Sequence, residues 1–228
     1  MMDMRDQALQ ASCPVIAAPR FGPLPPMNNG QRVIVARNGT FIQTRLDWLD
    51  CILAMSQRPV AIRLPYGEVA EHLRFCFGVL PISLIEDFVA RARRRLPDEA
   101  ASVLIYSRTT GGLRLAMCEP ISASPVHISY RRPAMGRDET VAVDLHTHGR
   151  LPPFWSDEDN RDDQGIVVAG VFGLLHQPAP TARFRLVVNG FHKPLDQHPW
   201  VGNGRDVSPS DLAGSHGGWI PSLLRRWW

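Results

Sequence analysis

From residue 83 onward, short apolar runs alternate with turn residues, a pattern typical of a β-sheet. Glycine-containing turns are predicted at residues 111–112, 136–138 and 189–190. The apolar runs have the length of strands and lie at residues 102–106, 113–117, 126–130, 141–145, 166–175 and 183–188. We expect these runs to form one central sheet.

Two helices are predicted beside these strands. The first begins at Ser83, whose hydroxyl caps the helix, and Glu86 three residues later completes a capping box. Its buried face consists of apolar residues at helical spacing, namely Leu84, Ile85, Phe88, Val89, Ala92 and Leu96. Its other face carries arginines, which serve solubility or contact a partner or nucleic acid: Arg91, Arg93, Arg94 and Arg95. The second helix follows Ser156, a capping residue with an acidic first turn after it.

These elements predict a mixed α/β fold in which helices flank a central mixed β-sheet. We expect this domain to span residues 81–199. The remaining residues, 200–228, form a C-terminal tail rich in Gly, Ser and Asp. The tail ends in Trp227 and Trp228, which pack back onto the core or bind a groove on a partner.

The N-terminal third has a different pattern. Residues 1–31 contain five prolines and predict a flexible arm without helix or strand. Residues 32–80 predict a small β-rich module, which begins with a hairpin turning at Asn38-Gly39. Residues 46–55 fit a short helix or a third strand, and residues 61–64 fit a further strand.

Composition and charge restrict the classes of partner. The chain has 228 residues, of which 44% are hydrophobic and 21% charged, so it can bury a core of its own. The longest apolar run, residues 166–175, is about half a membrane span, and no membrane partner is expected. A net charge of +3 is too small to indicate nucleic-acid binding. Four scattered cysteines and an N-terminus without an apolar signal segment favour the cytoplasm.

The candidate chemistry lies between Val141 and Gln164. His146 and His148 are two residues apart on a predicted strand, so their side chains share a face and their Cα atoms lie roughly 6.5–7 Å apart. Asp159 in the first turn of the following helix is the natural third ligand. Catalytic zinc sites use three protein ligands and leave the fourth position to water. We therefore expect one Zn²⁺ ion per chain.

Attack by water on an amide also needs a base. The upstream candidates are Glu68, Glu71, Glu86, Glu99, Glu119 and Glu139. Glu99 lies between the first helix and the strand at residues 102–106, where its side chain can point along the sheet, and it is our choice. Asp144 shares the face of the histidines and is either a residue that orients them or a surface aspartate. Asp162 and Asp163 are expected to be solvated.

The full pattern resembles the JAMM motif of the MPN/JAB metallopeptidases. That motif is an upstream glutamate followed by H-[ST]-H, seven residues, Ser, two residues and Asp, which places it here on Glu99, His146-Thr147-His148, Ser156 and Asp159. The local sequence D-L-H-T-H-G most resembles that of the A component of PRTRC (ParB-related, ThiF-related cassette) systems. The resemblance covers about residues 83–195. This sequence differs from the family pattern at two places. At Ala100 to Ser102 the family commonly has a glycine-containing stretch, and at the position of Gly149 the family often has proline.

The resemblance implies a deaminase-like MPN core with zinc held by His146, His148 and Asp159. It implies that Glu99 is the general acid/base and that Ser156 stabilises the oxyanion. The implied activity is hydrolysis of a peptide or isopeptide bond at the C-terminus of a ubiquitin-like protein. A ThiF-like activating enzyme of the same cassette would be a partner.

Three other classes of protein contain related domains or motifs: non-catalytic scaffolds, barrel hydrolases and zinc deaminases. A non-catalytic MPN scaffold that binds protein partners and keeps a structural metal is the alternative. Barrel hydrolases that contain D-x-H-x-H need a long barrel after the motif, and only 80 residues follow His148. Zinc deaminases need H-x-E and a later P-C-x-x-C, which the sequence lacks.

Overall fold

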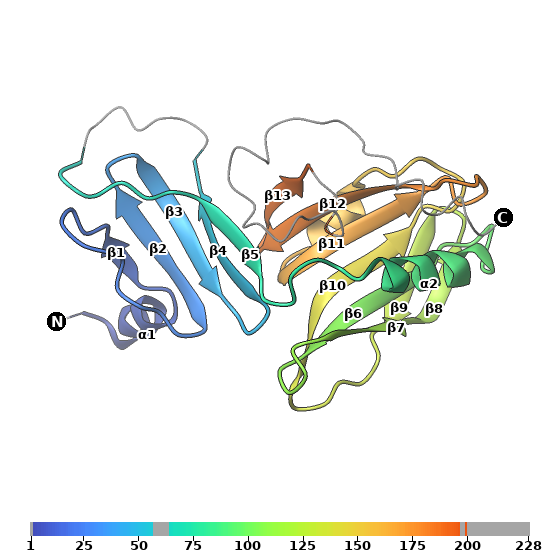
Figure 1. The fold of residues 1–228 in the computed structure, drawn as a ribbon, viewed down its shortest axis with the longest axis horizontal. Helices are drawn as coiled ribbons and strands as arrows, with labels where there is room; N and C mark the ends of the chain where they lie inside the picture. The colour runs from blue at the N-terminus through green and yellow to red at the C-terminus, as the bar shows by residue number, and fades with distance from the viewer. Residues whose placement is uncertain (1, 57–63, 197–198, 200–228) are drawn as a thin grey trace. The chain divides into compact units, whose positions relative to one another are not determined.

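The computed structural model describes residues 2–56, 64–196 and 199. They fall into two compact units, which meet in sequence between Gly78 and Val79 and are described separately. Figure 1 shows the elements of each unit along the chain. The C-terminal tail, with its two tryptophans, lies outside the described residues.

The N-terminal unit is a five-stranded sheet preceded by helix α1 (Met4–Ser12). Its strands in spatial order are β1 (Val15–Ala17), β2 (Gly30–Ala36), β3 (Gly39–Arg45), β4 (Leu49–Ala54) and β5 (His72–Phe75). Strand β1 runs parallel to β2, and the other neighbours are antiparallel.

The prediction that residues 1–31 lack helix and strand is wrong. Asp3 caps α1 by accepting a hydrogen bond from the Arg5 amide, and the helix ends before the first proline, Pro14. Strand β1 then fits between Pro14 and Pro19. The prolines therefore separate these elements and do not prevent them.

The hairpin at the start of the predicted β-rich module is present, but its turn is displaced. Ala36 pairs with Gly39, so Arg37 and Asn38 form the turn, not Asn38-Gly39. Asn38 bonds both backbone groups of Val69, donating to its carbonyl at 2.8 Å and accepting from its amide at 3.0 Å. The segment at residues 46–55 contains the strand β4 and no helix. The strand predicted at 61–64 falls mostly on residues 61–63, which lie outside the described part.

The C-terminal unit is organised around a six-stranded mixed sheet, as predicted, but the expectation that the run at residues 126–130 joins this sheet is wrong. Strands β10 and β11 are parallel, and all other neighbours are antiparallel. The strands in spatial order are β13 (Phe191–Leu195), β12 (Thr181–Val188), β11 (Ile166–Gly173), β10 (Glu139–Thr147), β6 (Ala101–Ser107) and β7 (Leu113–Met117). A separate hairpin is formed by β8 (Glu119–Ser124) and β9 (His127–Arg131).

Helix α2 (Ile82–Arg93) packs on one face of this sheet. Phe88 of the helix meets Phe172 of β11 edge to face, with ring centroids 5.3 Å apart, and both side chains are fully buried. The predicted capping box at Ser83 is wrong, because the helix starts at Ile82 after Pro81 and has no side-chain cap. Ser83 therefore lies within the first turn.

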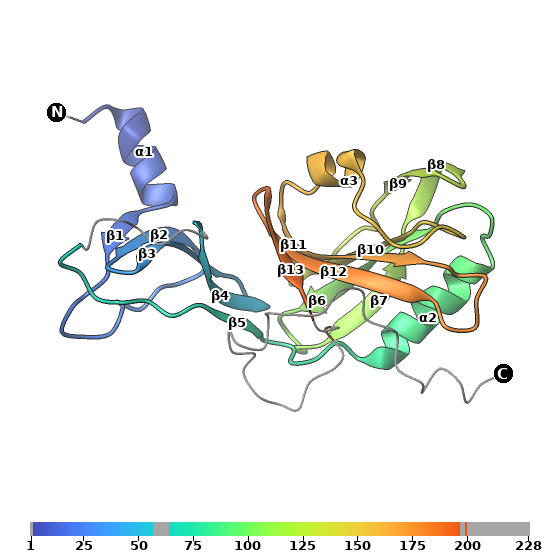
Figure 2. The same cartoon turned by 90° about the horizontal axis from the view of Figure 1, so that it is seen from above.

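The other face of the sheet carries α3 (Asp157–Asp162) and the β8–β9 hairpin (Figure 2). Ile128 and Tyr130 of the hairpin pack against Ala101, Val103 and Ile105 of β6. The predicted site residues lie on this face of the sheet, opposite α2.

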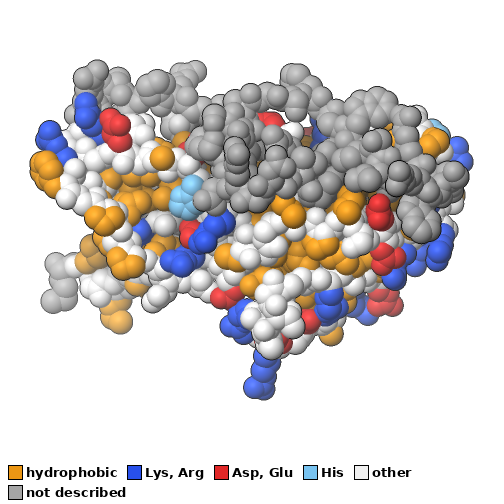
Figure 3. Space-filling view, in the orientation of Figure 1, with side chains coloured by type: hydrophobic (Ala, Val, Ile, Leu, Met, Phe, Trp, Pro, Cys, Tyr) orange, Lys and Arg blue, Asp and Glu red, His pale blue; other side chains and the backbone are white. Residues whose placement is uncertain are grey.

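Charged side chains are mixed on the described surface. On the face seen in Figure 3, Lys and Arg lie among Asp and Glu and not in one continuous patch of the described residues. Within the described residues, every helix is too short or too polar to cross a bilayer.

Candidate metal centre

Strand β10 positions the two histidines. His146 pairs with Val171 of β11 on one side and with Ala101 of β6 on the other. His148 directly follows the strand, and its amide donates to the carbonyl of Phe172 at 2.8 Å. The residue between them, Thr147, is fully buried, and its hydroxyl oxygen accepts from the Ala100 amide at 3.0 Å. This bond holds the segment that follows Glu99 beside the histidines.

Two glycines allow the chain to turn after His148. Gly149 has φ +53°, which proline cannot adopt, and this explains the departure from the family pattern. A Cβ atom on Gly173 would collide with the backbone of the loop at Leu151 to Pro153. The amides of Leu174 and Leu175 donate to the carbonyls of Leu151 and Gly149, respectively, at 2.8 and 3.0 Å. The loop is therefore held across the end of β11.

Helix α3 presents Asp159 through a complete capping box. Ser156 caps the helix, and its hydroxyl oxygen accepts from the Asp159 amide at 3.0 Å. In return, Oδ2 of Asp159 accepts from the amide and the hydroxyl of Ser156, both at 2.7 Å. These bonds fix the carboxylate with Oδ1 turned towards His146.

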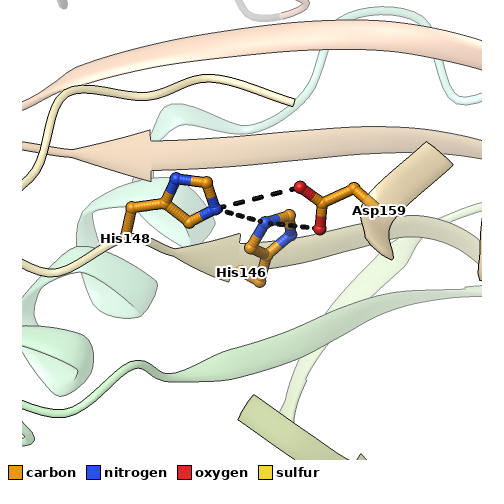
Figure 4. Close-up of side chains that lie close together, drawn as sticks. All are labelled: His146, His148 and Asp159. Atoms are coloured by element: carbon orange, nitrogen blue, oxygen red, sulfur yellow. Dashed lines mark hydrogen bonds and ion pairs between the residues drawn. The ribbon is translucent and has the colours of Figure 1, made fainter. Parts of the chain in front are cut away.

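The three predicted ligands converge (Figure 4). The Nε2 atoms of His146 and His148 are 3.2 Å apart, and His146 Nε2 lies 3.2 Å from Asp159 Oδ1. His148 Nε2 lies 3.9 Å from Asp159 Oδ2. Bonds of about 2.0–2.1 Å to a tetrahedral zinc ion put donor atoms roughly 3.3 Å apart. The group has the donor types and spacing of a zinc site and could hold a metal ion.

Burial keeps both imidazoles in the form that binds metal. It lowers the pKa of His146 to about 4, although the nearby Asp159 carboxylate opposes the shift. Burial likewise lowers the pKa of His148. Both rings are therefore neutral at pH 7, with ring nitrogens available as ligands.

Glu99 lies in the same cavity as the three ligands. The cavity has a volume of about 210 Å³, and its lining includes Glu99, His146, His148 and Asp159. Only 7% of the Glu99 residue surface is exposed. Burial, reinforced by the negative charges of Asp159 and Glu158, raises the pKa of Glu99 to about 7. A group that titrates near neutrality suits proton transfer.

Asp144 ties the β8–β9 hairpin to the sheet. It is buried, and it accepts from the Tyr130 hydroxyl at 3.0 Å and from Arg132 Nη2 at 2.6 Å. It is therefore no surface aspartate, and the hydrogen bonds described for it lead to the hairpin, not to the histidines. A hairpin residue, His127, also lines the cavity and contacts Glu158 at 3.3 Å.

Arg185 is a buried charged residue that sequence reasoning missed. Its guanidinium forms an ion pair with Asp163 at 2.7 Å, so the prediction that Asp163 is solvated is wrong, whereas Asp162 is exposed. The signal in the sequence was an arginine at an alternating position of the apolar run at residues 183–188.

Two family models match the chain, one on each unit. Residues 81–187 match the family described as prokaryotic homologs of the JAB domain, and residues 3–76 match a domain of unknown function, DUF2016. No curated protein matches the chain. The solution structure of protein DSY2949 from Desulfitobacterium hafniense is 20% identical and covers 49% of this chain and 85% of its own, with a TM-score of 0.39. The chain thus contains a JAB-like domain at residues 81–187.

Proposed function

We propose that the chain is a zinc-dependent metallopeptidase of the JAMM type. One observation carries the proposal: three donor side chains at zinc-ligand spacing share a cavity with a buried glutamate whose pKa is raised to about 7. The JAB domain family includes some peptidases, which adds support, although its prokaryotic homologs are often non-catalytic. The reaction would be hydrolysis of a peptide or isopeptide bond.

His146, His148 and Asp159 would hold the zinc ion. A zinc ion bound there would polarise the scissile carbonyl and lower the pKa of water at the site. The buried Thr147 and the Ser156 bonds to Asp159 keep the three donors in place before metal arrives. Such preorganisation is what supporting residues contribute in metal sites.

Glu99 would move the proton. Its carboxylate form takes a proton from the attacking water, and its acid form then gives that proton to the leaving nitrogen. In the metal-free protein, the raised pKa makes both forms accessible near pH 7. Stabilisation of the oxyanion by Ser156 requires its hydroxyl to turn from Asp159 Oδ2 towards the substrate.

The substrate we propose is the C-terminus of a ubiquitin-like protein, free or conjugated, with a ThiF-like activating enzyme of a PRTRC-type cassette as partner. This part rests on the motif resemblance. Exposed apolar side chains at Val126, Leu151 and Phe154 line the cavity and suit an extended polypeptide. For the rival scaffold function, a structural zinc needs four protein ligands, and the group among the described residues provides three.

Cleavage of a linear fusion with a ubiquitin-like protein tests the proposal. Wild type loaded with zinc should release the C-terminal partner. Glu99→Gln should keep zinc and lose cleavage, whereas His146→Ala should lose both. Full cleavage by Glu99→Gln would show that Glu99 is not the group that transfers the proton. A zinc-loaded wild type that cleaves no fusion or isopeptide substrate would favour the scaffold.

A further inference from the structure

Helix α3 carries Asp159 but has no apolar anchor of its own. It is six residues long, and none of its residues is buried. Isolated helices shorter than about 12 residues are marginal in water, because nucleation is costly and packing normally stabilises them. The capping box fixes the first turn internally, but it does not attach the helix to the sheet. Another interaction must set the position of Asp159 relative to the histidines.

Arg185 supplies that attachment from the neighbouring sheet. It lies on β12 opposite Ala169, a residue that lines the metal cavity, so its side chain belongs to the face that carries the site. Only 4% of the residue surface is exposed. A buried guanidinium is costly unless its donors and its charge are matched.

Three partners of Arg185 belong to the segment around α3. Nε and Nη2 donate to Oδ2 of Asp163 at 3.0 and 2.7 Å, and Nη1 donates to Oδ1 of Asn160 at 2.6 Å. Cζ lies 3.9 Å from the ring centroid of Trp155. Trp155 precedes the helix and Asp163 follows it, so one side chain holds the segment on both sides of Asp159.

The other surroundings of Arg185 restrict its movement. Nη1 also faces Nδ1 of His192 on β13 at 3.4 Å. The ring of Trp155 lies edge-on to that of His146, with centroids 6.3 Å apart. Residues 155–163 are thereby connected to β13 through Arg185 and to His146 through Trp155.

We propose that Arg185 is a positioning residue that fixes residues 155–163 against β12 and so determines where Asp159 stands relative to His146 and His148. Its effect on metal affinity rests on the metal binding assumed in the proposed function, whereas its effect on the order of the segment does not. The planar fork matters, because a lysine ammonium cannot bond Asn160 and Asp163 and stack on Trp155 in the same way.

The test compares Arg185→Met and Arg185→Lys with Arg183→Met. Arg183 lies two residues earlier on the same strand and is exposed, so it controls for the loss of a strand arginine. The first readout is amide hydrogen exchange of residues 157–163 in the chelator-treated protein. The second is the zinc dissociation constant, measured by competition with a chromophoric chelator.

Both Arg185 variants should speed exchange across residues 157–163 and weaken zinc binding by about 10- to 100-fold. Arg183→Met should match wild type in both. If Arg185→Met does not fold, the pair Asn160→Ala and Asp163→Ala removes the same bonds from the other side, where Asn160 is exposed and Asp163 is half-buried. Unchanged exchange and unchanged zinc affinity in a folded variant would overturn the proposal.

The readouts separate this proposal from the proposed function. A wild type that binds zinc but cleaves nothing would count against the peptidase and leave the role of Arg185 standing if both effects appear. A wild type that binds no zinc would remove the metal centre, and hydrogen exchange alone would then decide: faster exchange in Arg185→Met supports the attachment, and unchanged exchange refutes it.

Discussion

The side chains of Ser156 and Asp159 bond each other's backbone and are bonded to each other. The Ser156 hydroxyl donates to Asp159 Oδ2 at 2.7 Å, and its oxygen accepts from the Asp159 amide at 3.0 Å. One oxygen of the carboxylate is therefore held at the helix start, and the other is left to face His146 at 3.2 Å. A residue predicted for oxyanion stabilisation thus also orients a predicted metal ligand.

We predict that Ser156→Ala weakens zinc binding by about tenfold, because Asp159 loses the bond that fixes its rotamer. Loss of the cap should also lower the free energy of unfolding by about 1 kcal/mol. Ser156→Thr keeps the hydroxyl and should retain most of the zinc affinity and most of the free energy of unfolding. Chelator competition and urea unfolding measure them, and equal zinc affinity in the alanine variant would refute the orienting role.

Gly149 should not tolerate a side chain. Its φ of +53° is strained for other residues, and a Cβ would lie 3.0 Å from the Pro97 carbonyl oxygen. Gly149→Ala should cost about 1–2 kcal/mol of unfolding free energy. Gly112→Ala is the control, since a Cβ there meets only an ordinary contact at 3.5 Å. Equal stability of the two variants in urea unfolding would contradict this account of the turn.

The stability of the metal-free protein should depend on pH through Glu99. Burial raises the pKa of Glu99 in the folded state to about 7 from its ordinary value of 4.5, so the folded state binds the proton more tightly than the unfolded state does. The stabilisation is complete below pH 4.5 and is lost as the pH rises towards 7. Wild type should therefore lose stability relative to Glu99→Gln across this window. Urea unfolding in the presence of a chelator measures the difference, and a constant difference would refute it.

Arg132 should contribute to stability through Asp144. Arg132→Met leaves the buried carboxylate with Tyr130 as its described partner and should cost about 1–3 kcal/mol of unfolding free energy. Arg131→Met is the matched control, because its ion pair with Glu119 is exposed and should be worth under about 1 kcal/mol. Adding Asp144→Asn to Arg132→Met should recover part of the loss. Strict additivity in this double-mutant cycle would rule out the coupling.

The six-stranded sheet was largely predictable because most of its strands are encoded locally. β-Branched and apolar runs marked β10, β11 and β12, and the predicted bounds of β7 agree with Leu113–Met117. Strand β8 was missed because its residues are mostly exposed or half-exposed and include Pro120, so it has no apolar run. Helix α1 was missed for a related reason: it has no buried residue and depends on the local cap at Asp3.

The ligand group could be anticipated because its spacing is local. His146, His148, Ser156 and Asp159 lie within fourteen residues, and strand and helix periods place them. The contacts of Arg185 could not be anticipated in this way, because its partners Asn160 and Asp163 lie 25 and 22 residues away in the sequence. Only the pairing of β11 with β12 brings these partners together.

The most direct test of the account is the zinc content of the protein after loading and dialysis, measured by mass spectrometry for wild type, His146→Ala and His127→Ala. His127 lines the same cavity but is not one of the three grouped ligands, so its variant controls for loss of a histidine. We predict one zinc ion per chain in wild type and in His127→Ala, and none in His146→Ala. A wild type without zinc, or a His146→Ala variant that retains it, would contradict the account.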